Sequence, residues 1–325
     1  MSHLLILLAA IGLDRIVGDP PWLWQRVPHP VVIFGKGIDL FEKRLNTGAF
    51  TPEGRRLNGV FTILALLALT ILVGMLLSMI FHHLGFLGLI LEIIVVAVFL
   101  AQKSLGDHVQ AVGDGLLRNG LEGGRQAVAM IVGRDPKTLD EAGVSRAAIE
   151  SLSENFADGV VAPVFWYLIA GLPGILAYKM LNTADSMIGH KNERFLQFGW
   201  ASARLDDLAN WPAARLSAGF IAVAALLRLG AGAGRRSLSA ALRDSGLHRS
   251  PNSGWPEAAM AGALDLQLAG PRVYGGIRVS EPMMHAAGRA DAGPQDILSG
   301  IRVFYTACSV MASSVALAWL MVRIF

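Results

Sequence analysis

Charged residues are scarce in this sequence. Of its 325 residues, 16% are charged and 53% are hydrophobic, whereas a soluble domain usually carries about a quarter charged residues. The mean hydropathy is correspondingly high, at +0.49. This deficit of charge implies that much of the surface faces lipid, and we therefore expect an integral membrane protein.

Cysteine and several familiar motifs are lacking as well. The single cysteine, Cys308, excludes an internal disulfide framework and a four-thiolate metal site. The phosphate-binding loop, the dinucleotide fingerprint and the nucleophile elbow of serine hydrolases do not occur. The net charge is only +3, without a run of like charges, so nucleic acid is not expected as a partner.

Long apolar runs define the expected membrane segments. Residues 60–80, 84–100 and 303–325 are each near the roughly 20 residues that cross a hydrocarbon core. Only residues 81–83 separate the first two runs, which predicts a tight hairpin. Residues 4–13 form a shorter run without a basic leader, and we interpret it as an interfacial or partly inserted helix rather than a cleaved signal.

Two further apolar segments leave alternatives open. Residues 160–180 have the length of a span but contain Pro163 and the trio 172–174, so one span and two half-helices that enter and return both fit. Residues 213–229 are only just long enough to cross. The basic residues concentrate in loops that would all lie in the cytoplasm, and this favours at least one re-entrant element.

We therefore expect an all-α fold, a polytopic membrane helical bundle with about four to six membrane segments, forming one catalytic domain over residues 1–325. The expected location is the cell inner membrane, with the polar motifs at its cytoplasmic interface. Glu92 lies within one of the segments. Because a carboxylate inside a membrane is costly, it either forms a hydrogen bond between helices, which we favour, or belongs to a site or proton path.

The remaining polar residues are clustered between the apolar segments. Around residue 154, apolar side chains recur at helical spacing and would share one face: Ile149, Leu152, Phe156 and Val160. Glu150, Glu154 and Asp158 form a stripe on another face, each one turn from the next. Like charges at this spacing repel, so either a bound cation such as Mg²⁺ compensates them or the stripe is an ordinary solvated face.

Carboxylates and amides also gather in residues 182–210. Asp206 and Asn210 are one helical turn apart, as are Asn182 and Ser186 in the preceding segment, which also contains Asp185. Hard oxygen ligands of this kind suit Mg²⁺ that is bridged to substrate phosphates. Nearby cations would hold the phosphate oxygens, namely Lys191, Arg194 and Arg204.

A last polar cluster begins at residue 250. Asn252 and Ser253 supply turn and cap chemistry, and Pro256 suits the first turn of a helix. Glu257 then lies near the start of that helix, where the helix dipole favours a carboxylate. This is the structural interpretation of Glu257.

With these motifs in view, the sequence resembles the CobD/CbiB family of cobalamin biosynthesis, the membrane-bound adenosylcobinamide-phosphate synthases. The resemblance runs over nearly the whole chain. Its motifs occur in order: Asp14-Arg15, Gly18-Asp19-Pro20, His29-Pro30-Val31, Gly143-Val144-Ser145-Arg146, Ser153-Glu154-Asn155, the stretch 158–163, Asn182-Thr183, Asp185-Ser186-Met187, Lys191-Asn192-Glu193-Arg194, the stretch 198–207, Ser250-Pro251-Asn252, the stretch 254–264 and Tyr274-Gly275-Gly276. Departures at Phe156, His190, Arg272 and before Pro212 remove none of the acidic motifs.

The resemblance implies an enzyme that joins a propionate carboxylate of (adenosyl)cobyric acid to the amine of (R)-1-amino-2-propanol or its O-phosphate, giving (adenosyl)cobinamide or its phosphate. A carboxylate resists attack by an amine, so ATP with Mg²⁺ is the expected means of activation. The implied partners are these substrates, with the corrinoid as the large one, and membrane lipid. A homo-oligomer or a complex with other corrinoid-pathway membrane enzymes is compatible with this role.

Site residues follow from the same resemblance. The catalytic set is Glu154, Asp158, Asp185, Asp206, Asp207 and Glu257, with Glu257 as the base that takes the ammonium proton. Mg²⁺ would be bound by the first five of these residues. ATP or substrate would be bound by Asn155, Asn182, Lys191, Arg194, Arg204 and Asn252.

Two other functions fit parts of the sequence. Asn182-x-x-Asp185 and Asp206-Asp207-x-x-Asn210 loosely resemble the Mg²⁺-diphosphate motifs of membrane prenyltransferases, but that architecture needs more membrane helices. A non-catalytic transporter or regulator predicts charged residues deep inside spans and an inverted repeat. Glu92 is the one such residue in a convincing span and no repeat is visible, so the enzyme is favoured.

Overall fold

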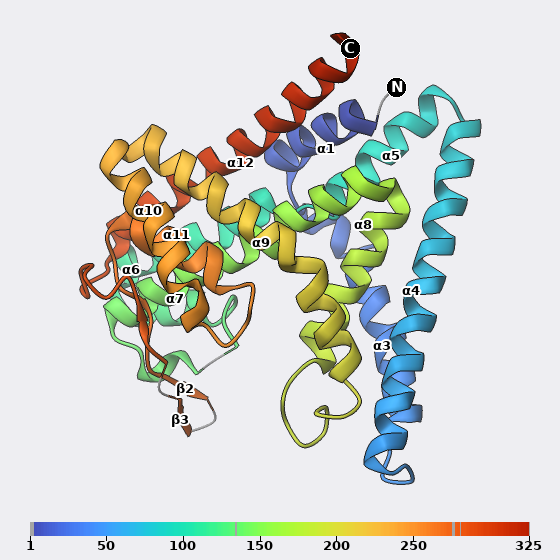
Figure 1. The fold of residues 1–325 in the computed structure, drawn as a ribbon, viewed down its shortest axis with the longest axis horizontal. Coiled ribbons are helices and arrows are strands. Elements are labelled where there is room, and N and C mark those ends of the chain that lie inside the picture. The colour runs from blue at the N-terminus through green and yellow to red at the C-terminus, as the bar shows by residue number, and fades with distance from the viewer. Residues whose placement is uncertain (1–2, 134, 275–276, 280, 325) are drawn as a thin grey trace. The chain divides into compact units, whose positions relative to one another are not determined.

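The computed structural model describes residues 3–133, 135–274, 277–279 and 281–324. This part of the chain is almost entirely helical and contains four strands of two or three residues, which confirms the all-α prediction (Figure 1). Five helical segments of the described chain are long and apolar enough to cross a membrane, within the predicted range.

The chain divides into two compact units, and neither is continuous in sequence. Unit 1 comprises Met1–Leu100 and Ala162–Asn210, and unit 2 comprises Ala101–Val161 and Trp211–Phe325. The helix α9 (Trp200–Leu229) gives its first part to unit 1 and the remainder to unit 2. Each unit therefore brings together segments that are far apart in the sequence.

Unit 1 is organised by the long helix α4 (Pro52–His83), which packs along α8 (Ala162–Ile188) and α3 (Pro30–Leu45) (Figure 1). The helices α1 (His3–Val17) and α5 (Phe86–Val98) pack on each other and on α8. The second part of α8 carries the first of the polar motifs of residues 178–210.

The predicted hairpin between the first two apolar runs is present. α4 contains residues 60–80 and passes into α5 through a two-residue turn, so residues 81–83 belong to α4 rather than to the turn. The hairpin is tight, since a Cβ placed on Gly88 would lie 1.8 Å from the carbonyl oxygen of Phe81. α5 has only 13 residues, which is about 20 Å of helix against a hydrocarbon core of about 30 Å. The candidate span that begins with α5 continues beyond it, from Phe86 to Val128, and the crossing of the membrane by residues 84–100 stays a prediction.

The predicted interruption within residues 160–180 is also present. α8 changes direction at Ala170 and Gly171, and the φ of Gly171 is +60°, which glycine adopts without strain. A Cβ on Gly174 would lie 2.2 Å from the carbonyl oxygen of Trp166, whereas eight residues of a straight helix extend over about 12 Å. α8 is therefore sharply bent at this point, as a broken or re-entrant segment would be. Its place in a membrane stays a prediction.

Glu92 of α5 has the partner that the favoured interpretation requires. The hydroxyl of Tyr167 on α8 donates a hydrogen bond to its Oε1 at 2.6 Å, and both residues are buried. An inter-helix hydrogen bond inside unit 1 therefore accounts for this carboxylate.

Five longer helices build unit 2: α6 (Gln102–Val128), α7 (Glu141–Phe156), α10 (Ala231–Asp244), α11 (Gly254–Leu264) and α12 (Pro294–Ile324). α7 packs on α6, α11 and α12, and α10 packs closely on α11 (Figure 1). α6 doubles back at Gly120, where φ is +64°, much as α8 does at Gly171. The predicted apolar face around α7 is confirmed, because Ile149, Leu152, Phe156 and Val160 are all fully buried.

Short elements complete unit 2: η1 (Pro136–Thr138), the π-helical turn η2 (Ala157–Val161), η3 (Ser245–Leu247), β1 (Leu268–Ala269), β2 (Arg272–Tyr274), β3 (Ile277–Val279) and β4 (Met283–Met284). β1 pairs with β4 and β2 with β3, both antiparallel. In the motif Tyr274-Gly275-Gly276, the two glycines lie outside the described residues.

Candidate functional site

Six polar residues of unit 1 form a connected group, the α8–α9 cluster: Tyr178, Asn182 and Asp185 from α8, and Asp206, Asp207 and Asn210 from α9. The α8 members are spaced four and three residues apart, which places them on one face of that helix. The first part of α9 presents Asp206 and Asn210 one turn apart. Helical periodicity places each set on one face of its helix, and contacts between α8 and α9 bring the two sets together.

Asp206 is the centre of the α8–α9 cluster, with only 8% of its surface exposed. The Nδ2 atom of Asn210, one turn away, donates to its Oδ2 at 2.9 Å, and Nδ2 of Asn182 lies 3.5 Å from its Oδ1. The hydroxyl of Tyr178 donates to Oδ1 of Asn210 at 2.8 Å. The buried carboxylate is therefore oriented by an amide that is itself oriented by a phenol.

Negative charge dominates this cluster. The charges of Asp185 and Asp207 both act on the carboxylate of Asp206. The Oδ1 atom of Asp185 lies against Gly189, since a Cβ there would be 1.8 Å away. Lys191 and Arg204 are exposed, and their charges act on Asp207. Carboxylates with cations beside them form a suitable place for a divalent cation bridged to phosphate.

A metal cage made wholly of protein ligands is not formed. Within the described part of the chain, no three His, Cys, Asp or Glu side chains are placed to hold an ion together. Mg²⁺ usually keeps several waters and takes one or two carboxylates from the protein, the rest of its shell coming from substrate phosphates. Asp185 and Asp206, with the amide oxygen of Asn182 nearby in sequence and structure, fit that mode of binding.

An apolar pocket of ≈390 Å³ adjoins the cluster within unit 1. Its walls come from α4, α8 and α9 and include Ile71, Trp166, Ala177 and Leu208. Tyr178 also lines it, so the same side chain contacts the pocket and orients Asn210. A polar site with an apolar pocket beside it suits an amphipathic substrate.

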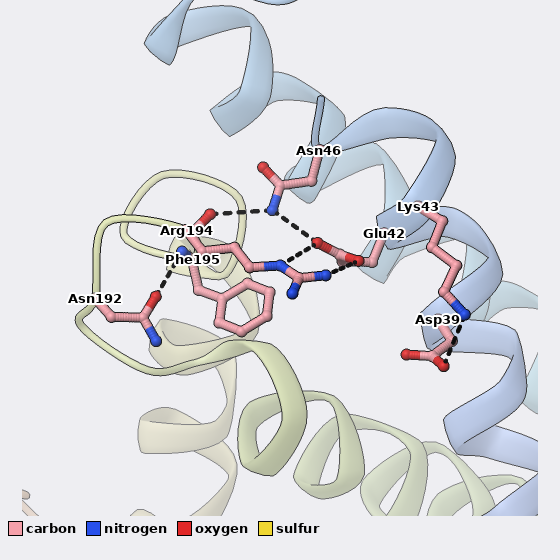
Figure 2. A network of polar contacts seen from close by, with 7 residues as sticks. All are labelled: Asp39, Glu42, Lys43, Asn46, Asn192, Arg194 and Phe195. Carbon is pink, nitrogen blue, oxygen red and sulfur yellow. Dashed lines mark hydrogen bonds and ion pairs between the residues drawn. The ribbon is translucent and has the colours of Figure 1, made fainter. Parts of the chain in front are cut away.

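Arg194 is bound to a carboxylate outside the α8–α9 cluster. Its guanidinium forms two hydrogen bonds with the carboxylate of Glu42 on α3, at 3.0 and 2.8 Å (Figure 2). This pairing raises the pKa of Arg194, because the hydrogen bonds and the charge of Glu42 both favour the protonated guanidinium. The predicted role of Arg194 in binding phosphate stays a prediction, whereas its bond to Glu42 is a feature of the fold.

The acidic stripe of α7 and η2 belongs to unit 2. Glu150 is buried and its Oε1 accepts the N–H of Ala269 at 2.8 Å, so the alternative of an ordinary solvated face is wrong for this residue. Oε1 of Glu154 accepts a hydrogen bond from the hydroxyl of Ser253 at 2.9 Å. Asp158 lies in the π-helical turn η2, a type of distortion that is frequent at functional sites. Asn155 is exposed and donates to the carbonyl oxygen of Ser151.

The cluster that begins at residue 250 lies in the same unit. Oδ1 of Asn252 accepts a hydrogen bond from Arg215 at 2.9 Å, and the guanidinium of Arg215 stacks over the ring of Trp255. Glu257 lies in the first turn of α11 and is 1% exposed, with Nε2 of His248 3.7 Å from its Oε1. This position fits its structural interpretation at the helix start, and its role as a base stays a prediction.

The motif at His29 caps a helix. Its Nδ1 accepts the N–H of Val31 at 3.2 Å and so begins α3, and its Nε2 lies 3.7 Å from Oδ1 of Asp19. The short helix α2 (Pro21–Trp24) brings the ring of Trp24 against the imidazole. Burial lowers the pKa of His29 and outweighs the charge of Asp19, which raises it.

Several of these partners were missed by sequence reasoning. Tyr178 precedes Asn182 by one helical turn, so spacing alone would have found it. Glu42, Asn46 and Arg215 are far along the chain from the residues they bind, and no local pattern marks them.

Comparison with known proteins places this chain in a family. The family model described as CobD/Cbib protein matches residues 7–304. The chain belongs to the CobD/CbiB family. Its curated relatives include proteins named cobalamin biosynthesis protein CobD, from Sinorhizobium sp (66% identical, covering 96% of this chain and 97% of the relative), Brucella suis (53%, covering 97% and 96%) and Rhodobacter capsulatus (44%, covering 98% of each). No solved structure matches the chain significantly.

Membership in the CobD/CbiB family confirms the resemblance seen in the motifs. The matched region contains the whole α8–α9 cluster and both polar segments of unit 2. It ends within α12, and this whole helix is one of the five candidate membrane spans of the described residues.

Proposed function

We propose that this protein acts in cobalamin biosynthesis as an ATP-dependent amide ligase, the adenosylcobinamide-phosphate synthase. It joins a propionate carboxylate of (adenosyl)cobyric acid to the amine of (R)-1-amino-2-propanol or of its O-phosphate. Support comes from family membership and from one observation above all. Asp206 is a buried carboxylate held by two amides, acted on by two further carboxylates, with Lys191 and Arg204 beside them.

The chemistry needs an activated acyl group. In the proposed reaction the γ-phosphoryl group of ATP is transferred to a propionate oxygen, giving an acyl phosphate and ADP. The amine then attacks the carbonyl carbon, phosphate leaves, and the proton lost from nitrogen passes to a base. Bound Mg²⁺ neutralises phosphate charge in this chemistry.

Residues of the α8–α9 cluster have specific roles in this proposal. Asp185 and Asp206 would hold Mg²⁺, and Asn182 and Asn210 keep the Asp206 carboxylate in place. Lys191 and Arg204 would bind phosphate oxygens, which are the anions that Lys and Arg recognise best. The predicted roles of the site residues of unit 2 remain part of the proposal: Glu154 and Asp158 as further Mg²⁺ ligands, Asn155 and Asn252 in binding ATP or substrate, and Glu257 as the base.

The proposal also includes a location. The expected setting is the cell inner membrane, with the polar motifs on the cytoplasmic side, because the basic loops favour that side. The apolar pocket beside Tyr178 supports an amphipathic substrate that enters from the interface. ATP is a cytoplasmic substrate, so this orientation also brings nucleotide and site together.

A turnover assay on detergent-purified protein tests the proposal. The reaction contains cobyric acid, Mg²⁺-ATP and aminopropanol O-phosphate, with mass spectrometry of the corrinoid and parallel detection of ADP. We expect a product with the mass of the amide, formed only when ATP and the amine are both present. If folded protein yields neither the amide nor corrinoid-dependent ADP, the ligase proposal is wrong, and a transporter or regulator becomes the better interpretation.

A further inference from the structure

The loop of residues 189–199 connects α8 to α9 and carries Lys191, whose charge acts on Asp207. It consists of turns rather than a regular helix or strand. Within it, Oδ1 of Asn192 accepts the N–H of Phe195 at 2.9 Å. Turns of this kind open locally unless packing or polar contacts tie them to a rigid element.

Both ends of this loop are fixed by close backbone packing. A Cβ on Gly59 of α4 would lie 1.8 Å from the carbonyl oxygen of Phe198, and a Cβ on Gly199 would lie 1.6 Å from that of Ile188. The C-terminal end of the loop therefore touches α4 and the end of α8 directly. The middle of the loop, which includes Lys191, is held by a different set of contacts.

The anchor of this middle part is Glu42, on the face of α3 that Figure 2 shows opposite the loop. The Nε and Nη2 atoms of Arg194 donate to its two carboxylate oxygens, at 3.0 and 2.8 Å. Asn46, one turn further along α3, donates through Nδ2 to Oε1 of Glu42 at 3.1 Å and to the carbonyl oxygen of Arg194 at 3.0 Å. α3 thus holds the side chain and the backbone of residue 194 together.

Burial of Glu42 makes its ion pair with Arg194 costly to break. Glu42 is 4% exposed, and a buried carboxylate that loses its cation is strongly destabilised. A substrate phosphate that bound the Nε and Nη2 atoms of Arg194 together would have to displace Glu42 from those atoms. Lys191 is exposed and is the cation of this loop that acts on the α8–α9 cluster.

We propose that Glu42 and Arg194 are positioning residues, whose ion pair, completed by Asn46, holds the 189–199 loop so that Lys191 stays beside Asp207. Arg194 therefore acts through Glu42 and does not bind the substrate phosphate. The part of this inference that concerns phosphate binding by Lys191 rests on the proposed ligase function, whereas the anchoring itself does not.

Limited proteolysis of the purified full-length protein tests the anchoring without any assay of activity. Glu42→Gln keeps Lys191 and Arg194 as tryptic sites, and we expect cleavage after Lys191 to become roughly tenfold faster, because the loop opens more often. Arg194→Gln removes the same pair from its exposed side and gives the same result at Lys191. Asp114→Asn is the control, since it breaks an exposed ion pair with Arg118 on α6, a helix of unit 2, and leaves cleavage after Lys191 unchanged. Cleavage at the wild-type rate in both folded variants would overturn the anchor.

Kinetics of the same variants then distinguish positioning from phosphate binding. We expect Glu42→Gln, Arg194→Gln and the double variant to raise the KM for Mg²⁺-ATP by the same factor, roughly three- to tenfold, with kcat nearly kept. If only Arg194→Gln raises KM, or if the two effects multiply in the double variant, Arg194 contacts the nucleotide itself and the inference is wrong. If the wild type makes no amide, the ligase proposal fails while the proteolysis result still decides the anchor.

Discussion

The hydroxyl of Tyr178 donates a hydrogen bond to Oδ1 of Asn210, so the amide nitrogen of Asn210 is the atom that faces Asp206. All three residues are buried within unit 1. The hydroxyl of Tyr178 therefore fixes the orientation of the Asn210 amide relative to the Asp206 carboxylate. Tyr178 also lines the apolar pocket.

The substitution Tyr178→Phe removes the hydroxyl that orients Asn210 and keeps the aromatic ring. We expect kcat/KM for amide formation to fall roughly fivefold, since a buried hydrogen bond contributes about 1 kcal/mol and Asn210 is then free to rotate. The turnover assay measures this effect, with thermal unfolding as the check that the variant is folded. Unchanged kcat/KM would mean that Tyr178 does not orient the site.

Asp185→Asn and Asp206→Asn test the proposed metal ligands. Each variant should lose roughly 10–100-fold in turnover at limiting Mg²⁺ and recover part of it at high Mg²⁺, because a ligand charge is lost but the shape is kept. Asp291→Asn, at a highly exposed carboxylate, is the control and should behave as wild type. If both cluster variants keep full turnover at limiting Mg²⁺, the metal assignment is wrong.

Tyr167→Phe tests the structural interpretation of Glu92. The variant leaves a buried carboxyl group without its donor and should lower the free energy of unfolding by about 1–3 kcal/mol, seen as a lower Tm in detergent. Combining it with Glu92→Met replaces both polar partners by apolar groups and should restore most of that loss. A folded Glu92→Gln protein with full turnover would agree with this interpretation, whereas an inactive one would favour the proton path.

The lowered pKa of His29 predicts that the stability of the protein depends on pH. Its pKa in the folded protein is lowered, chiefly by burial, so protonation favours the unfolded chain. The stabilising contribution is fully present above the unfolded pKa of about 6.5 and is lost as pH falls through that value toward the lowered folded pKa. His29→Asn keeps a residue that caps α3 but does not titrate. Its Tm should therefore fall less than that of the wild type between pH 7.5 and 5.5, and equal falls would contradict the assignment.

Local periodicity was sufficient to predict much of this molecule. The buried face around Leu152 and the placing of Asp206 and Asn210 one turn apart both follow from the 3.6-residue repeat of a helix. The break in α8 could be placed within residues 160–180 because Pro and Gly interrupt the apolar run there. The reversal of α6 at Gly120 was not foreseen, since a glycine with positive φ looks in sequence like any other glycine.

Contacts between residues far apart in the sequence are the part of the site that could not be predicted. Arg194 lies in a basic motif and was assigned to phosphate, because nothing near it in the sequence indicates a carboxylate partner. Its partner Glu42 is 152 residues away and sits in an unremarkable helix. The same holds for Arg215, which meets Asn252 only through the fold of unit 2.

The interleaving of the two units constrains the order in which the protein can be made. Residue 42 leaves the ribosome long before residue 194, and all of Ala101–Val161, which belongs to unit 2, is synthesised in between. During that interval the carboxylate of Glu42 has no guanidinium to pair with and α8 is not there to pack against α4. Unit 1 is therefore completed late in translation, from a nascent chain whose first hundred residues must wait for their partners.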